Sequence, residues 1–235
     1  MATLAALRRR LRQPASSAKA KVLQRFFRTG PGEYGEGDIF LGVTVPQMRA
    51  VARQFADLAL ADVARLLSSP IHEERLCALL ILVHRFQAGD ERERDRVFRF
   101  YLRHLRYVNN WDLVDLSADK IVGAHLVGRS TALLARLTRS RNIWERRIAI
   151  VATFAFIRSG QYRPTLTVAQ LLISDRHDLI HKAVGWMLRE VGKRDVAVLE
   201  AWLRPHYRGM PRTMLRYAIE RFPAGRRRAY LTGTV

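Results

Sequence analysis

Apolar residues recur every three or four positions along most of this chain, and no stretch alternates steadily between apolar and polar residues. In residues 45–55, Met48, Val51, Ala52 and Phe55 share one helical face, and Pro46 stands in the first turn. The same periodicity predicts helices at residues 45–55, 72–86, 92–107, 111–122, 131–137, 143–157, 168–173, 179–191, 196–207 and 212–222. Short turns rich in glycine, proline and serine separate these segments. The pattern therefore predicts an all-α fold.

A coarse internal repeat runs through the predicted helices. Comparable helices begin near Asp112, Trp144 and Lys182, at intervals typical of two-helix repeats. Such repeats stack into an α-α superhelix, whose inner helices form a concave surface. We expect a single domain over residues 1–235, with flexible ends at 1–18 and 224–235.

One region interrupts the helical pattern. Residues 29–38, TGPGEYGEGD, contain four glycines and one proline, which predicts a loop with positive φ angles. The same composition also suits an ordinary surface loop, and the sequence assigns this one no role.

The chain is strongly basic, with 41 lysine and arginine residues against 21 acidic ones and a net charge of +20. Such a charge indicates a polyanionic partner, and nucleic acid, an anionic membrane surface and the ribosome all satisfy it. Nearly all the basic residues are arginines, whose planar forks match phosphate oxygens. A GC-rich genome would also produce this arginine excess, but it would not account for the net charge.

Several function classes lack support in the sequence. The single cysteine, Cys77, lies in an apolar run and is expected to be a buried, unreactive thiol. Nucleotide-binding glycine motifs, zinc-protease motifs and the serine-hydrolase elbow are absent, and the histidines show no metal-ligand spacing. The chain has neither a secretory signal pattern nor an apolar stretch long enough to span a bilayer. We therefore expect a cytoplasmic, nucleoid-associated protein with no membrane partner.

Tryptophans and charges cluster at three points of the predicted helices. Trp111 and Asp115 are four residues apart, so they lie one above the other on one helical face, and Asp112 is expected near the helix N-terminus. The other clusters surround Trp144 and Trp186. Taken singly, each cluster is more typical of core tryptophans and surface ion pairs than of a functional site. Together, on a chain of charge +20, they suggest a carboxylate, indoles and guanidinium groups that converge on a polyanion.

The blocks YGEGDIFLGVTVPQMRAVA, NNWDLVD, SRNIWERRIAIVATF and LIHKAVGWMLREVGKRD resemble, in order and spacing, those of the AlkD family of DNA alkylation-repair glycosylases. The resemblance covers residues 21–222. It implies a HEAT-like helical superhelix that excises N3- or N7-alkylated purines without a metal or organic cofactor. The implied partner is duplex DNA that contains alkylated purines, bound by a monomer with no obligate protein partner.

The resemblance also implies roles for individual residues. The catalytic aspartate of the family matches Asp115, and its two sugar-contacting tryptophans match Trp111 and Trp186. The implied DNA-binding residues are basic side chains of the same blocks: Arg49, Arg146, Arg147, Lys182 and Arg189. Phe26 stands where some relatives carry tyrosine, and Thr44–Val45 replace a more polar pair, so no family-type DNA contact is expected there.

Two alternatives remain open from the sequence. A non-catalytic helical scaffold for DNA or a branched junction would share the fold and the charge but would not need Asp115. A protein-binding superhelix would instead present its basic surface to an acidic protein or to RNA. The presence of Asp115 together with Trp111 and Trp186 favours the enzyme.

Overall fold

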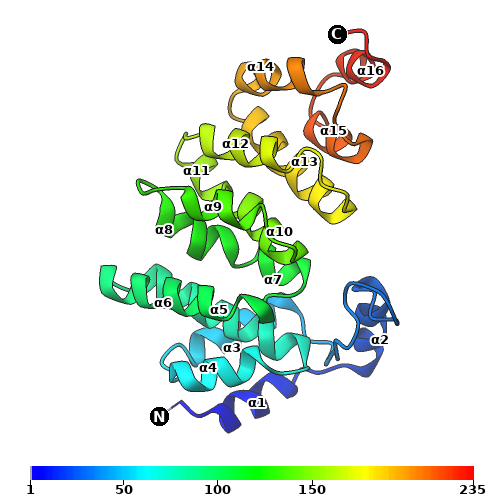
Figure 1. Cartoon of the computed structure of the whole chain (residues 1–235). Coiled ribbons are helices and arrows are strands. Elements are labelled where there is room, and N and C mark those ends of the chain that lie inside the picture. Colours follow the sequence, from blue (N-terminus) through cyan, green and yellow to red (C-terminus); the bar gives the residue numbers. More distant parts are fainter. Residues whose placement is uncertain (1) are drawn as a thin grey trace. The chain divides into compact units, whose positions relative to one another are not determined.

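A computed structural model describes residues 2–235, and the described chain is all-α, as the periodicity predicts (Figure 1). It contains no β-strand, only one isolated parallel bridge between Ile39 and Ile71. None of its helices is both long and apolar enough to cross a bilayer. The chain divides into two compact units, Met1–Ile121 (unit 1) and Val122–Val235 (unit 2). The single domain expected over residues 1–235 stays a prediction.

One long, buried helix is at the centre of unit 1. The helices of this unit are α1 (Leu4–Arg12), α2 (Ser17–Phe26), α3 (Val45–Gln54), α4 (Leu60–Leu67), α5 (His72–Ala88), α6 (Glu91–Arg103), the 3-10 turn η1 (Leu105–Tyr107) and α7 (Trp111–Asp115). Helix α5 packs against α3, α4 and α6. Residues 76–83 of α5 are buried on every side, as expected for a helix without a polar face.

The first turn of α5 holds three other segments of unit 1. Glu73 accepts hydrogen bonds from the backbone amides of residues 41–43, at 2.8–3.2 Å. Glu74, which is 1% exposed, forms ion pairs of 3.0 Å with both Arg8 and Arg12 of α1. Since His72 binds two further segments described below, one helical turn fixes much of the N-terminal half of unit 1.

Gly42 allows the loop before α3 to approach α2. Its φ of +81° lies in the left-handed region, which favours glycine. A Cβ atom there would lie 2.2 Å from the carbonyl oxygen of Ser16. The backbone of residues 41–43 therefore reaches Glu73 only because position 42 has no side chain.

Unit 2 is organised around its own long helix. The boundary between the two units falls within the π-helical turn η2 (Asp119–Gly123). The helices of unit 2 are α8 (Ala124–Leu126), α9 (Ala132–Leu137), α10 (Ile143–Ala152), α11 (Phe154–Arg158), α12 (Arg163–Leu171), α13 (Asp178–Gly192), α14 (Val196–His206), α15 (Arg212–Ala218) and α16 (Ala224–Thr232). Helix α13 packs against α10, α12, α14 and α15. A Cβ at Gly185 would lie 2.5 Å from the carbonyl oxygen of Met214, so this glycine permits the close contact of α13 with α15.

Both ends of the chain that were expected to be flexible contain a helix. Residues 1–18 include α1, whose Leu7 and Leu11 are fully buried, and residues 224–235 include α16, whose Tyr230 is buried. The helical pattern of the first segment is hidden by the basic run Arg8–Arg10. Apolar periodicity also does not predict helices α2 and α4.

Candidate active site

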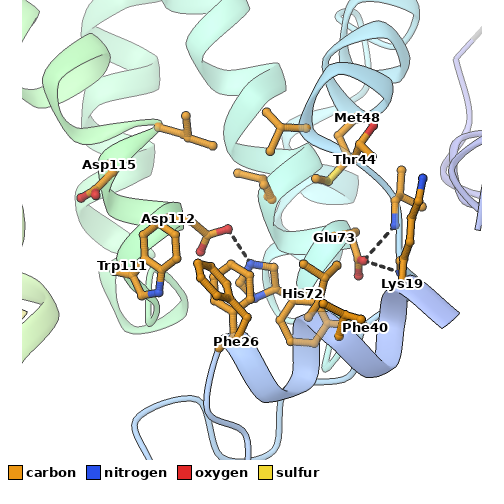
Figure 2. Close-up of a pocket in the computed structure, with 18 residues that line it drawn as sticks. Lys19, Phe26, Phe40, Thr44, Met48, His72, Glu73, Trp111, Asp112 and Asp115 are labelled. Carbon is orange, nitrogen blue, oxygen red and sulfur yellow. Dashed lines mark hydrogen bonds and ion pairs between the residues drawn. The ribbon is translucent and has the colours of Figure 1, made fainter. Parts of the chain in front are cut away.

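Helix α7 places the tryptophan and the aspartate of the NNWDLVD block beside one cavity of unit 1. Trp111 and Asp115 both line this cavity, which has a volume of about 530 Å³, and both side chains are half-buried. The prediction that they share one helical face is thus confirmed. Figure 2 shows the Asp115 carboxylate turned away from the aromatic side chains of the cavity, at its edge.

Aromatic rings form much of the cavity wall. Trp111 stacks on Phe27 at a centroid distance of 5.0 Å and 12° between planes, and Phe26 meets the indole edge-on at 5.7 Å. Phe27 in turn stacks on Phe40 at 5.0 Å. One indole face is therefore covered by the protein. Phe26 is 61% exposed and presents no hydroxyl at the position where some relatives carry tyrosine.

Asp112, the other carboxylate of α7, acts at the helix N-terminus as expected, because its Oδ1 accepts the backbone amide of Leu113 at 2.8 Å. The side chain of Asn110, which precedes the helix, accepts the backbone amide of Trp111. Asp112 is also buried, and its Oδ2 lies 2.8 Å from Nε2 of His72. Nδ1 of the same imidazole lies 2.9 Å from Asp38, at the end of the glycine-rich loop. His72 thus joins α7 to that loop through two buried carboxylates, and Figure 2 shows the contact with Asp112.

The electrostatics of this cluster favour a protonated histidine. Burial lowers the pKa of His72, but the negative charge of Asp112 and the hydrogen bonds to Asp112 and Asp38 outweigh it and raise the pKa to about 9. For Asp38, burial raises the pKa, but the hydrogen bond from His72 and the charge of Arg75, 2.5 Å away, hold it below its usual value. Asp38, His72 and Asp112 therefore form a charged, buried triad that anchors α7.

The remaining predicted residues lie elsewhere. Arg49 is exposed on α3 of unit 1, whereas Arg146, Arg147, Lys182, Trp186 and Arg189 belong to unit 2. The structure therefore brings together Trp111 and Asp115 within unit 1, and the convergence of the two groups of residues on one DNA-binding face stays a prediction.

Two of the four tryptophans keep exposed surface, and they are Trp111 and Trp186. Trp186 lies on α13, with its ring centroid 6.0 Å from that of Phe154. Trp144 and Trp202 are buried in the core of unit 2. The indole of the cluster around Trp144 is therefore structural.

Most of the basic residues expected to bind DNA in unit 2 have partners within the protein. Arg146 lies 2.6 Å from Asp175 and also donates to the carbonyl oxygen of Ser140. Arg189 pairs with Glu220. Lys182 lies 2.7 Å from Asp178, but its side chain is 42% exposed, so it is the most accessible of these cations.

Arg147 is placed as a structural residue. It is only 5% exposed, and its Nη1 donates to the backbone carbonyl of Leu179 at 2.6 Å, which links α10 to the second residue of α13. This placement favours a bond between helices over the phosphate contact that the resemblance implies.

We expect Arg147→Ala to lower the free energy of unfolding by about 2–3 kcal/mol, since a hydrogen bond donated by a buried charged group is removed. Thermal denaturation checks this. Lys182→Ala, the matched variant at a more exposed cation, should leave the melting temperature nearly unchanged. If Arg147→Ala instead melted like the wild type and had a weaker salt dependence of DNA binding, the phosphate role would be restored.

Sequence reasoning missed His72 and the aromatic cavity. The available signal was the run His72-Glu73-Glu74-Arg75, four polar residues that open an otherwise apolar helix and are all buried in the structure. Buried charges of this kind are rare unless they are paired, so such a run predicts long-range partners. The glycine-rich loop supplies one of them, Asp38.

Comparisons with known proteins identify the family and the fold of the chain. Residues 7–222 match the family model described as "DNA alkylation repair enzyme". A solved structure described as "Predicted DNA alkylation repair enzyme from Enterococcus faecalis" shares the fold, with a TM-score of 0.67 and 14% sequence identity over 89% of this chain and 97% of that one. The search of curated proteins gave no match. Because the family model spans nearly the whole chain, the protein belongs to the DNA alkylation repair enzyme family.

Proposed function

We propose that this protein is a DNA glycosylase that hydrolyses the N-glycosidic bond of N3- or N7-alkylated purines in duplex DNA. The observation that carries the proposal is that the two carboxylates of α7 have different surroundings. Asp112 is buried against His72, whereas Asp115 keeps exposed surface at the edge of an aromatic cavity, beside Trp111. Family membership supplies alkylated DNA as the substrate class.

The chemistry follows from the charge of the substrate. An N3- or N7-alkylated purine is cationic, so it leaves as a neutral base when the bond from C1′ to the ring nitrogen breaks, and no general acid is needed. The sugar becomes an oxocarbenium-like cation. The carboxylate of Asp115 stabilises that charge, orients the water that adds to C1′ and accepts the proton that this water loses.

The tryptophans act on the same cation. An indole face attracts positive and polarised C–H groups by about 0.5–2 kcal/mol. Since Phe27 covers one face of Trp111, only the opposite face is available to the sugar. Trp186 is proposed to contact the deoxyribose from unit 2, in keeping with its partial exposure.

Incubation with duplex DNA carrying radiolabelled methyl groups tests the proposal. Chromatography of the soluble fraction should show free 3-methyladenine or 7-methylguanine, released faster than in a protein-free incubation. Tight DNA binding without release of either base would contradict the proposal and favour the non-catalytic scaffold. Equal binding to DNA and to unrelated polyanions would favour an acidic protein or RNA as partner.

A further inference from the structure

A second concavity of unit 1 has a character opposite to that of the aromatic cavity. Its volume is about 300 Å³, and its polar lining consists of Arg49 and Arg53 of α3, His84 and Gln87 of α5, and Lys120 beyond α7. The rest of the lining is apolar: Ala52, Leu80, Val83 and Leu116. We call this concavity the basic hollow.

The two arginines of the basic hollow are not neutralised by the protein. Within the described residues 2–235, the side chains of Arg49, Arg53 and His84 make no hydrogen bond or ion pair. Other arginines of unit 1 do, such as Arg85 with Glu93. Lys120 alone in the hollow has a carboxylate partner, Asp119, at 2.9 Å.

This arrangement is unfavourable without an anion. Arg49 and Arg53 are four residues apart on α3, and like charges at that spacing destabilise a helix. Two guanidinium forks beside an imidazole and an ammonium suit the oxygens of a phosphate group. The hollow therefore has the chemistry of a phosphate-binding site.

Its position relates it to the proposed reaction. Leu116 lines both the basic hollow and the aromatic cavity, and it directly follows Asp115. A carboxylate that approaches a DNA strand is repelled by the neighbouring phosphates. The cations of the basic hollow, which only Leu116 separates from the aromatic cavity, offset this repulsion and hold the strand in place.

We propose that the basic hollow binds a backbone phosphate of the damaged strand, next to the nucleotide whose sugar faces Asp115. The identity of that nucleotide rests on the proposed function, whereas the phosphate contact does not require glycosylase chemistry. The inference adds Arg53, His84 and Lys120 to Arg49 as DNA-binding residues.

The first test compares Arg53→Gln with Arg65→Gln, a variant of equal charge change on α4 whose side chain is 71% exposed and lies outside the hollow. Affinity for an undamaged duplex is measured over a range of salt concentrations. The slope of log K against log salt should fall by about 0.9 for each phosphate that Arg53→Gln no longer neutralises, and it should stay unchanged in Arg65→Gln. Equal slopes for the two variants would overturn the proposal.

A second test locates the phosphate. Single neutral methylphosphonates are placed in turn along a duplex with an abasic-site analogue. Wild-type protein should bind more weakly when the substitution is next to that site, and the affinity of Arg53→Gln should fall no further there. If Arg53→Gln and the methylphosphonate lowered the affinity independently of each other at every position, the proposal would be contradicted. Binding of inorganic phosphate to wild type but not to Arg53→Gln, without any position-dependent decrease along the duplex, would contradict it as well.

The outcomes also separate the two proposals. A reduced salt slope in Arg53→Gln, with no base released by any form of the protein, supports the phosphate site and rejects the glycosylase. Base release by the wild type together with an unchanged salt slope in Arg53→Gln supports the glycosylase and rejects the phosphate site. Melting temperatures confirm that the variants are folded, which we expect because Arg53 and Arg65 are surface residues.

Discussion

Asp115→Asn should release 3-methyladenine and 7-methylguanine about 10²–10³-fold more slowly than the wild type under single-turnover conditions. The amide has the size of the carboxylate but no charge to stabilise an oxocarbenium-like sugar. Because Asp115 is half-buried at the edge of the cavity, the variant should keep its fold and its affinity for duplex DNA.

The matched control is Asp95→Asn on α6, which removes a carboxylate from a surface pair with Arg99. Its rate of base release should equal that of the wild type. If Asp115→Asn also released both bases at the wild-type rate, the mechanism assigned to this carboxylate would be wrong.

His72→Gln should lower the free energy of unfolding by about 3–5 kcal/mol, because it leaves the buried carboxylate of Asp112 without its counter-charge and leaves Asp38 with Arg75 as its only cation. Urea denaturation near pH 6 measures this decrease. Base release should fall as well, since the bond from His72 to Asp112 anchors the five-residue helix that carries Trp111 and Asp115.

The pH dependence of the free energy of unfolding tests whether His72 is protonated in the folded protein. The pKa of His72 is raised from 6.5 to about 9 in the folded protein, so its contribution to stability is complete below pH 6.5 and is lost as the pH rises through about 9. Wild type should therefore lose stability across this window and His72→Gln should lose much less. His104→Gln, at a half-buried histidine bonded to a backbone carbonyl, should behave like the wild type. The same pH profile in wild type and His72→Gln would show that the imidazole is neutral in the fold.

The helices that could be predicted from the sequence are those whose apolar faces repeat locally. Residues 72–86 were predicted as a helix and lie within α5. Residues 111–122 and 143–157 were each predicted as one helix, but both are interrupted. The hydroxyls of Ser117 and Thr153 donate to nearby backbone carbonyls, at 2.5 and 2.6 Å, close to each interruption. Such local bonds compete with the regular helical pattern, and apolar periodicity does not reveal them.

The site was predictable only where its geometry is local. A spacing of four residues sufficed to place Trp111 and Asp115 on one face. The role of His72 could not be predicted from the sequence because its partners are 34 and 40 residues away along the chain. Their proximity is a property of the tertiary fold. The same limit applies to Arg147, whose burial follows from the packing of α10 against α13.

The paired bonds of Glu74 have a practical consequence for anyone who shortens this protein. A truncated form that starts after Arg12 would lack α1 and would leave an interior carboxylate facing no cation. In the sequence, the first dozen residues resemble a dispensable basic tail. Removing them should nevertheless lower the yield of folded protein. Affinity tags and fusion partners are therefore better joined upstream of Leu4 than substituted for this segment.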